Sequence, residues 1–534
     1  MLKKHYKKLA IVSIVMILML ATTLPALGAP EKVRVFVEFA PGAEGKVQQA
    51  LKAQGAQFHY TFEGLNSFVV SLPEQALKGL ARNPNVVDIE VDAPRYPVEA
   101  IPMEASVETA AIYEDIGNIE VEQVLPWGVQ AVQAPEVWST GTEGPIIGEG
   151  ITVCIIDTGY YEGHEDLKAA TGGMSQVDDD WAEDGYGHGS HVAGTIAAQD
   201  NTWGVIGVAP GVELYIVKIF DNAGEWVKQA HASDLIAAAL NCADNGANII
   251  SMSLSGTQSN KKEQRTFDQI YADGVLSIGA ASNDGIEEYH YPASYESVIS
   301  VAALDANQEF ADFSQFNDAV ELAAPGVSVL STIPYSDSST VTVDGVIYSG
   351  FHVEFAGRGE VSGTLVDGGL CNSVGDWSGA VVLCERGDIS FADKIFNVEA
   401  GGGVAALIYN NLPEDLYATM GDFSSELISI GFNQEIGEYL VAEKLGETAY
   451  VSSIFDWPAS GYEAWGGTSM ATPHVSAVAA LLWSANPDLT NVEIREAMDA
   501  TALDLGDLGR DVHYGYGLVQ AFDALDYIEC GSGE

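Results

Sequence analysis

Three short segments of the chain carry side chains that could together hydrolyse a carbonyl compound. Ser469 lies in residues 467–474, directly before a stretch (471–483) that has the composition of a helix. A serine at a loop-to-helix junction is exposed and lies near backbone N–H groups that have no partner inside the helix. If a base removes its proton, such a hydroxyl can attack a carbonyl carbon. The rest of the chain must then supply a base, a group that orients the base, and a site for the oxyanion.

Two upstream segments supply the base and its orienting carboxylate. Residues 151–159 form an apolar run that ends in Asp157, which is typical of a buried parallel strand with a functional side chain at its C-terminal end. Residues 184–195 form a glycine-rich turn that enters a helix of small residues and places His188 at its start. Aspartic proteases also use Asp-Thr-Gly, but they need two copies to share a proton, and this chain has one. A turn-forming Asp157, a packed His188 and an N-cap Ser469 remain the structural alternatives.

The chain order Asp, His, Ser, with all three motifs, resembles the subtilisin-like serine proteases, or subtilases. The resemblance implies that His188 takes the proton of Ser469 while Asp157 holds the imidazole in the required tautomer. Subtilisin is itself a reference case for this mechanism, which is carried over here by resemblance. Asn283, in residues 280–285, resembles the family's oxyanion donor and would act together with the Ser469 N–H. His191 and His474 are expected to be structural.

The resemblance also assigns a substrate-binding edge, which would pair with an extended peptide as an added β-strand. Two serines of this edge, Ser255 and Ser282, occupy positions where the family usually has glycine. The preference for the side chain before the cut (P1) therefore stays open. The residues assigned to the edge are Ser253, Leu254, Ser255, Gly256, Ala281 and Ser282.

A calcium site is implied by the same resemblance. Hard cations favour carboxylate, amide and carbonyl oxygens. The expected ligands are the side chains of Gln123, Asp166 and Asn201 and the main-chain carbonyls of Gln199, Trp203 and Val205. A solvated acidic loop is the alternative. Residues 178–180, with Asp184, could hold another ion, although charge runs are usually solvated.

Alternating strand and helix patterns between residues 153 and 303 predict a parallel sheet with helices on both faces. We therefore expect an α/β fold, the subtilisin-like three-layer sandwich, in two parts at residues 123–335 and 461–534. The stretch between them is too long for a structureless loop. Its β-rich pattern over residues 336–460 resembles a protease-associated (PA) domain, with an unrelated β-rich insertion as the alternative.

The N-terminal region predicts export and processing. Residues 1–29 combine lysines, an apolar run and small residues, which is typical of a secretory signal peptide. Residues 31–95 have a small α/β pattern that resembles the inhibitory propeptide of subtilases, with an accessory binding domain as the alternative. Residues 96–122 are rich in proline, glutamate and alanine, and we expect a linker that contains the processing site.

The composition of the chain limits the classes of partner that it could bind. The 534 residues carry a formal net charge of −53, from 23 basic and 76 acidic residues. This balance disfavours nucleic acid and anionic membrane surfaces. Of the five cysteines, Cys371 and Cys384 lie close enough in the sequence to bridge. Cys154 and Cys242 are interpreted as small buried hydrophobes, and no partner can be read for Cys530.

The sequence thus predicts a secreted, calcium-dependent serine endopeptidase that is made as an autoprocessed zymogen. We expect it to act on protein or peptide substrates, to use its own propeptide as inhibitor and folding aid, and to be a monomer without membrane contact after signal removal. The alternative is a catalytically inactive secreted protein that binds partners through the insert. A narrower variant is a processing protease of strict specificity.

Overall fold

The structure is a computed structural model that describes residues 32–98, 100–103, 123–141, 144–177, 180–221, 230–335, 337–353, 355–421, 423–455 and 461–531. The predicted signal peptide and most of the predicted linker lie outside these residues. Among the described residues, no helix combines the length and hydropathy needed to cross a bilayer.

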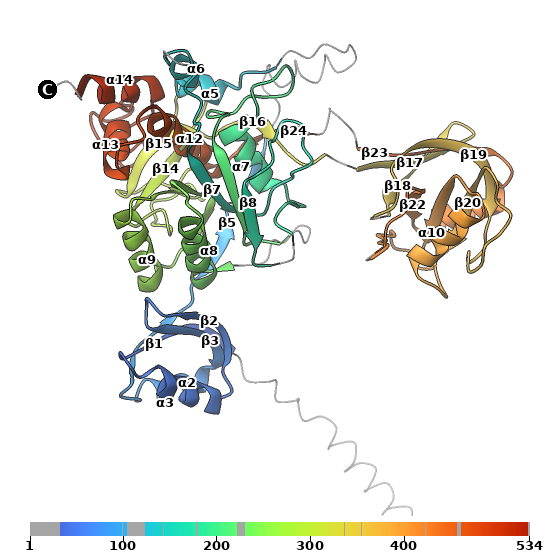
Figure 1. Ribbon diagram of the computed structural model, residues 1–534, viewed down its shortest axis with the longest axis horizontal. Helices are drawn as coiled ribbons and strands as arrows, with labels where there is room; N and C mark the ends of the chain where they lie inside the picture. The colour runs from blue at the N-terminus through green and yellow to red at the C-terminus, as the bar shows by residue number, and fades with distance from the viewer. Residues whose placement is uncertain are drawn as a thin grey trace, which may run out of the picture.

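A seven-stranded parallel sheet forms the centre of the largest domain (Figure 1). Its strands are buried apolar runs, as expected where helices cover both faces. All neighbouring pairs in it are parallel. In spatial order the strands are β15 (Val320–Pro325), β14 (Val298–Leu304), β13 (Leu276–Ala280), β11 (Ile249–Met252), β7 (Thr152–Asp157), β9 (Glu213–Lys218) and β8 (Gly172–Ser175).

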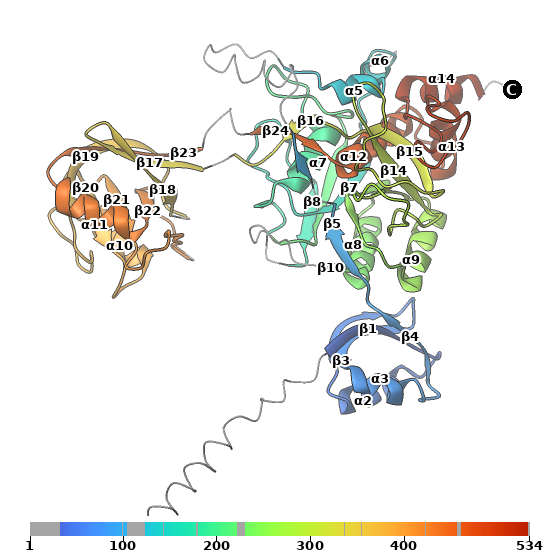
Figure 2. The same cartoon turned by 180° about the vertical axis from the view of Figure 1, so that it is seen from behind.

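Helices cover both faces of this sheet and complete a three-layer sandwich (Figures 1 and 2). One face packs against α7 (His188–Ala197), α12 (Thr468–Ala485), α13 (Asn491–Thr501) and α14 (Ala521–Gly531), and the other against α8 (Ala232–Asp244) and α9 (Lys261–Ala272). Every residue of α12 from Thr468 to Trp483 is buried, because small side chains let the helix lie close to the sheet. Two short helices, α5 (Trp127–Ala131) and α6 (Ala134–Trp138), complete the domain. The predicted α/β fold is confirmed.

The N-terminal unit is a four-stranded antiparallel sheet backed by two helices. Strand order is β2-β3-β1-β4. The elements are β1 (Lys32–Phe39), α2 (Glu44–Ala53), β2 (Gln57–Phe62), β3 (Ser67–Pro73), α3 (Glu74–Leu80) and β4 (Val86–Val91).

The insert forms a closed seven-stranded barrel that lies to one side of the catalytic domain (Figures 1 and 2). The barrel order is β17-β18-β22-β21-β20-β19-β23, and it has its own apolar core. Its elements are β17 (Asp337–Val343), β18 (Val346–His352), β19 (Gly359–Asp367), β20 (Ala380–Glu385), α10 (Phe391–Ala400), β21 (Ala405–Tyr409), β22 (Ile428–Phe432), α11 (Gln434–Glu443) and β23 (Thr448–Phe455).

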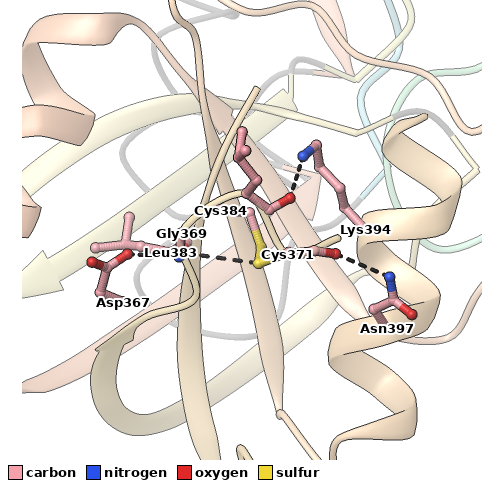
Figure 3. The surroundings of a disulfide bond; sticks show 8 residues. Asp367, Gly369, Cys371, Leu383, Cys384, Lys394 and Asn397 are labelled. Atoms are coloured by element: carbon pink, nitrogen blue, oxygen red, sulfur yellow. Dashed lines mark hydrogen bonds between the residues drawn. A yellow bond between two sulfur atoms is a disulfide. The ribbon is translucent and has the colours of Figure 1, made fainter. Parts of the chain in front are cut away.

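Two disulfides join described cysteines. Cys371–Cys384 forms as predicted and ties the loop after β19 to β20, where the Asn397 amide also donates to the Cys371 carbonyl at 3.0 Å (Figure 3). Cys154 of β7 bonds Cys242 of α8, across 88 residues of sequence. The interpretation of these two as free buried hydrophobes was wrong. Both are fully buried, but the helix packs over the strand so that their sulfurs meet. Cys530 is free and exposed.

Candidate active site

Asp157 and His188 meet at the C-terminal edge of the central sheet. Asp157 ends β7 and His188 begins α7, and Asp157 Oδ1 lies 2.7 Å from His188 Nδ1. Both side chains are buried. The same carboxylate oxygen accepts the Thr158 N–H at 2.7 Å, which fixes its orientation. Nδ1–H therefore faces the carboxylate and leaves Nε2 available as a base.

A buried carboxylate that the sequence did not single out for this purpose holds the loop before His188. Asp184 accepts hydrogen bonds from the Gly187 N–H at 2.8 Å, the Thr158 hydroxyl at 2.8 Å and the Ser190 N–H and hydroxyl at 2.8 and 2.7 Å. Asp184 therefore holds both the residue before α7 and the first turn of that helix. Asp178 and Asp179 lie outside the described residues, so the suggested ion site there stays a hypothesis.

Ser469 and Asn283 come together around Gly467. The helix α12 begins at Thr468, three residues earlier than expected, so Ser469 lies in its first turn. A Cβ on Gly467 would lie 2.8 Å from Ser469 Oγ and 3.0 Å from Asn283 Nδ2, so both groups surround a point that only glycine leaves open. Thr468, which sequence reasoning missed, donates to Asn283 Oδ1 from its N–H and its hydroxyl, both at 2.9 Å.

The Ser469 hydroxyl donates to the Sδ of Met470 at 3.2 Å, and Nε2 of His188 has no hydrogen-bond partner among the described residues. The two side chains therefore share no hydrogen bond among the described residues. Burial pushes the pKa of His188 down, but the Asp157 charge and hydrogen bond, the Asp184 charge and the nearby Val98 carbonyl push it up by more. The net direction of this pKa is upward.

The main-chain carbonyl of Ser469 has an unusual partner. Pro473 lies in the second turn of α12 and has no N–H to offer the carbonyl of Ser469 four residues earlier. The hydroxyl of Ser253 donates to that carbonyl instead, at 2.8 Å. A buried carbonyl needs a partner, so Ser253 completes the first turn of the helix that carries Ser469.

A segment of the same chain runs along the predicted substrate edge. β5 (Pro94–Pro97) pairs antiparallel with β12 (Leu254–Ser255), with Tyr96 opposite Ser255 and Pro97 opposite Leu254. The Val98 N–H then donates to the Ser253 carbonyl at 3.0 Å. The beginning of the predicted linker is therefore a strand bound in the groove. Its other edge pairs with β10 (Ala230–His231).

Farther along the chain, the same segment pairs with a second part of the domain. β6 (Ile101–Pro102) pairs with β24 (Tyr462–Gly466), which itself pairs with β16 (Val329–Thr332). The Met103 N–H donates to the Ala464 carbonyl at 3.1 Å. The chain is thus bound by main-chain hydrogen bonds on both sides of Val98, and the backbone of Val98 is close enough to His188 to raise its pKa.

The N-terminal unit docks on the helices next to this groove. Phe36, Phe62 and Val69 of its sheet share an apolar cluster with Ala232 and Ile236 of α8. At the start of α9, the buried Lys262 ammonium lies 3.0 Å from carboxylate oxygens of Glu38 and Asp88 and 3.4 Å from Glu90. Apolar contact and ion pairs therefore both hold the unit in place.

The two serines that depart from the family's glycines contact each other. Ser255 Oγ lies 3.2 Å from Ser282 Oγ and 3.5 Å from His290 Nδ1. Ser282 has φ +95°, a conformation that favours glycine. His290 is buried and its Nε2 lies 3.5 Å from the Asp284 carboxylate without a hydrogen bond. Burial lowers the pKa of His290 although Asp284 and Glu288 raise it. Of the remaining edge residues, Gly256 pairs with Tyr291 and Ala281 is buried.

The six residues of the predicted calcium loop come together. The Gln123 side-chain nitrogen lies 2.6 Å from the Gln199 carbonyl, 3.0 Å from the Val205 carbonyl and 3.4 Å from Asn201 Oδ1. The Asp166 carboxylate accepts from the Asn201 amide at 2.6 Å and the Val205 N–H at 2.7 Å. The Trp203 N–H donates to Asn201 Oδ1 at 2.8 Å.

The oxygen atoms of this loop therefore converge on one small region, and the side-chain nitrogen of Gln123 lies within it. A half-turn of the Gln123 amide would add one more oxygen to this set, in place of the hydrogen bond that its Oε1 accepts from the Asn201 N–H at 3.2 Å. This donor set suits a hard cation. Within the described ranges, no three His, Cys, Asp or Glu side chains form a metal cluster, because this loop uses amides and carbonyls.

The two histidines that the sequence predicted to be structural, His191 and His474, both pack in the interior of the domain. His191 is buried, stacks on Trp465 with ring centres 4.7 Å apart, and lies within 3.1 Å of the Val329 and Glu463 carbonyls. Burial lowers its pKa to about 3. His474 lies 2.8 Å from the Met470 carbonyl, and burial lowers its pKa to about 4. Neither ring has the geometry of His188, and neither can serve as a base near neutral pH.

A parallel α/β sheet with Asp157, His188 and Ser469 near its C-terminal edge, and a peptide segment bound across that edge, defines a serine hydrolase of the peptidase type. The family model of the subtilases matches residues 148–349 and 411–517, more than half of the chain, and the PA domain model matches residues 361–440. The chain belongs to the subtilase family of serine endopeptidases and carries an inserted PA domain.

Individual relatives agree. Subtilisin DY of Bacillus licheniformis is 40% identical over 216 residues, which cover 40% of this chain and 76% of that protein. A thermostable alkaline protease of Halalkalibacterium halodurans is 32% identical over 346 residues, 65% of this chain and 85% of that protein. Fervidolysin of Fervidobacterium pennivorans, a keratinolytic enzyme related to subtilisin, is 22% identical with a TM-score of 0.58. That match covers 94% of this chain and 62% of fervidolysin, and it supports the fold.

Proposed function

We propose that the chain is the zymogen of a secreted, calcium-binding serine endopeptidase in which Ser469 is the nucleophile, His188 the base and Asp157 the orienting carboxylate. The observation that carries this proposal is the 2.7 Å contact between Asp157 and His188, taken with the position of Ser469 in the first turn of α12. Proteins and peptides are the substrates of this family.

In the proposed mechanism these residues act in sequence. His188 Nε2 takes the proton of Ser469 as its oxygen attacks the substrate carbonyl, and Asp157 stabilises the imidazolium that forms. The side-chain amide of Asn283, held by Thr468, and the first-turn N–H of Ser469 stabilise the oxyanion. The imidazolium returns the proton to the leaving amine. Water then repeats the sequence on the acyl-enzyme.

The precursor cleaves itself after Val98. Tyr96, Pro97 and Val98 occupy the groove as a substrate's acyl side would, and the Val98 carbonyl lies beside His188. The bond to Glu99 is therefore the first substrate. After the cut, residues up to Val98 keep their contacts with α8 and α9, so the N-terminal unit blocks the groove as a product inhibitor until it is released.

Calcium binds at the loop of Gln123, Asp166 and Asn201 with the carbonyls of Gln199, Trp203 and Val205. The convergence of oxygen atoms around the Gln123 side chain supports this site. The loop ties the segment at Gln123, next to the strand bridge of Val124 with Val205, to the rest of the domain. A bound cation would cross-link these segments and stabilise the fold without a role in the reaction.

Export is supported by the lysine-rich and apolar pattern of residues 1–29 and by two disulfides, which persist in oxidising compartments.

The test is the fate of the precursor. Purified wild-type chain should yield two fragments separated after Val98, seen by intact mass and N-terminal sequencing. Ser469→Ala should remain one chain. A serine-directed phosphonate should label the processed enzyme at Ser469. An unlabelled protein that never processes would contradict the proposal and favour the inactive binding protein.

A further inference from the structure

Arg95 is a fully buried arginine that belongs to the segment in the groove. Its Nε donates to Glu263 Oε1 at 2.9 Å and its Nη2 to Glu263 Oε2 at 2.5 Å, a bidentate ion pair with no exposed side-chain surface on either residue. Nη1 donates to the Pro94 carbonyl at 2.7 Å and Nη2 also to the Gln258 carbonyl at 3.1 Å. Every nitrogen of the guanidinium therefore has an oxygen partner.

The pocket is built by the catalytic domain. Glu263 lies in the first turn of α9, where its N–H donates to the capping Asn260 side chain at 3.1 Å. The hydroxyl of Tyr295 donates to Glu263 Oε2 at 2.7 Å. The carboxylate is thus held by a residue of the same domain as well as by Arg95, and its two oxygens accept the two ends of the guanidinium fork.

The register places this pocket at a fixed distance from the cut. Arg95 lies opposite Ala230, Tyr96 opposite Ser255 and Pro97 opposite Leu254, and Val98 donates to the Ser253 carbonyl. If the cut follows Val98, Arg95 is the fourth residue on the acyl side (P4). Any peptide bound in the same register presents its P4 side chain to Glu263.

The two partners separate when the propeptide leaves. Arg95 departs with it, while Glu263 stays in the mature enzyme. Once the segment has left, water can solvate the carboxylate. A peptide that binds in the same register buries it again, which is strongly unfavourable without a cation, and a substrate arginine restores the whole set of contacts. A lysine cannot form the bidentate pair, and an apolar side chain leaves the carboxylate unpaired.

We propose that Glu263 makes the mature enzyme select substrates with arginine four residues before the cut. This inference rests on the proposed function, since it takes the cut after Val98 as its reference. It deepens that function by naming a substrate class: proteins with an arginine three residues before the residue at which they are cleaved.

The experiment uses quenched fluorescent peptides with Tyr-Pro-Val before the cut and arginine, lysine, citrulline or norleucine at P4. For the processed wild-type enzyme, we expect kcat/KM for arginine to exceed that for norleucine about 100-fold, because loss of one partner of a buried charged pair has an effect of this order. Citrulline keeps the shape without the charge and should resemble norleucine. Equal rates for all four peptides would overturn the inference and leave the proposed function intact. Cleavage of none of them would overturn both.

The pocket variant comes from a double substitution, because Glu263→Leu alone leaves the buried Arg95 charge without a carboxylate partner and disfavours folding of the precursor. In Arg95→Leu/Glu263→Leu the precursor keeps a matched apolar pair. Its mature enzyme differs from wild type only at residue 263, because Arg95 is removed with the propeptide. This enzyme should prefer norleucine over arginine. Asp268→Asn, which removes an exposed carboxylate from the same helix, should keep the wild-type preference. A mature Glu263→Leu enzyme that still prefers arginine would refute the role of Glu263.

Discussion

The hydroxyl of Ser253 completes the hydrogen bonding in the first turn of α12, by donating to the Ser469 carbonyl at 2.8 Å. Proline at position 473 makes this contact necessary, because the N–H that would normally serve this carbonyl is missing. One residue of the substrate edge therefore supports the nucleophile directly. This hydrogen bond couples the substrate edge to the turn of α12 that carries Ser469.

This coupling predicts a non-additive pair of substitutions. Ser253→Ala leaves a buried carbonyl unpaired and should destabilise the fold by about 1–3 kcal/mol. Adding Pro473→Ala supplies the N–H and should recover much of that loss. Thermal unfolding of both single variants and the double variant, in the Ser469→Ala precursor, measures the cycle. Strictly additive effects would show that the two residues do not share the carbonyl.

The acid limb of activity should lie above the ordinary imidazole range. His188 must be neutral to act as a base, and its pKa is raised in the folded state, mainly by Asp157 against the opposing effect of burial. Activity is therefore lost as pH falls through a pKa that lies above about 6.5. Profiles of kcat/KM against pH test this. Asp157→Asn should move the limb to lower pH and reduce kcat about 10⁴-fold. A limb that stays in place in this variant would contradict the assignment.

Calcium should stabilise the enzyme through Asp166. At a hundredfold excess over its Kd, a ligand that binds only the folded state adds about 3 kcal/mol to the free energy of unfolding. Chelation should therefore lower the thermal midpoint of the wild-type enzyme, and Asp166→Asn should remove most of this response. Asp200→Asn changes an exposed carboxylate of the same loop and serves as the control. An equal calcium response in both variants would place the ion elsewhere.

His290 should limit the size of the P1 side chain. The Ser255 and Ser282 hydroxyls and the His290 ring form a polar chain between the edge that holds Val98 and the Asn283 loop. We expect His290→Gly to raise kcat/KM for phenylalanine relative to valine at P1 about tenfold or more. Tyr289→Gly adds the same backbone freedom one residue earlier and should leave the ratio unchanged. A His290→Gly enzyme with the wild-type ratio would remove His290 from the pocket.

Lys262 should control release of the propeptide. Its buried ammonium contacts three carboxylates of the N-terminal unit, whereas the neighbouring Lys261 is largely exposed and lies 3.8 Å from Asp88. Lys262→Met should weaken inhibition by the cleaved propeptide, measured as its inhibition constant, by about 30-fold or more. Lys261→Met should change it little. Similar effects of both substitutions would indicate general electrostatic attraction in place of a specific contact.

The sequence predicted the elements that are local. Asp157 at a strand end, His188 at a helix start and Ser469 before a small-residue helix are each recognisable within about ten residues, because strand and helix periodicity is a short-range property. The approach of the calcium-loop residues was predicted as well, from a motif carried over from the family.

Contacts that depend on tertiary register were not predicted. The disulfide of Cys154 with Cys242 spans 88 residues, and the pair of Arg95 with Glu263 spans 168. Nothing near Glu263 in the sequence marks it as different from a solvated glutamate at a helix start. Its role follows only from the packing of α9 against the groove. The strand Pro94–Pro97, which overlaps the start of the predicted linker, was also missed. It is a strand because it pairs with β12, which is distant in the sequence.

The strand Pro94–Pro97 is covalently part of the molecule whose groove it fills. In the proposed autoprocessing, the first cut therefore requires no encounter between two molecules, and its rate should be first order in the chain. Maturation should proceed with the same half-life in dilute and in concentrated solution. This half-life is counted from the folding of the groove. Release of the propeptide is a dissociation, and it is the first step that concentration can influence.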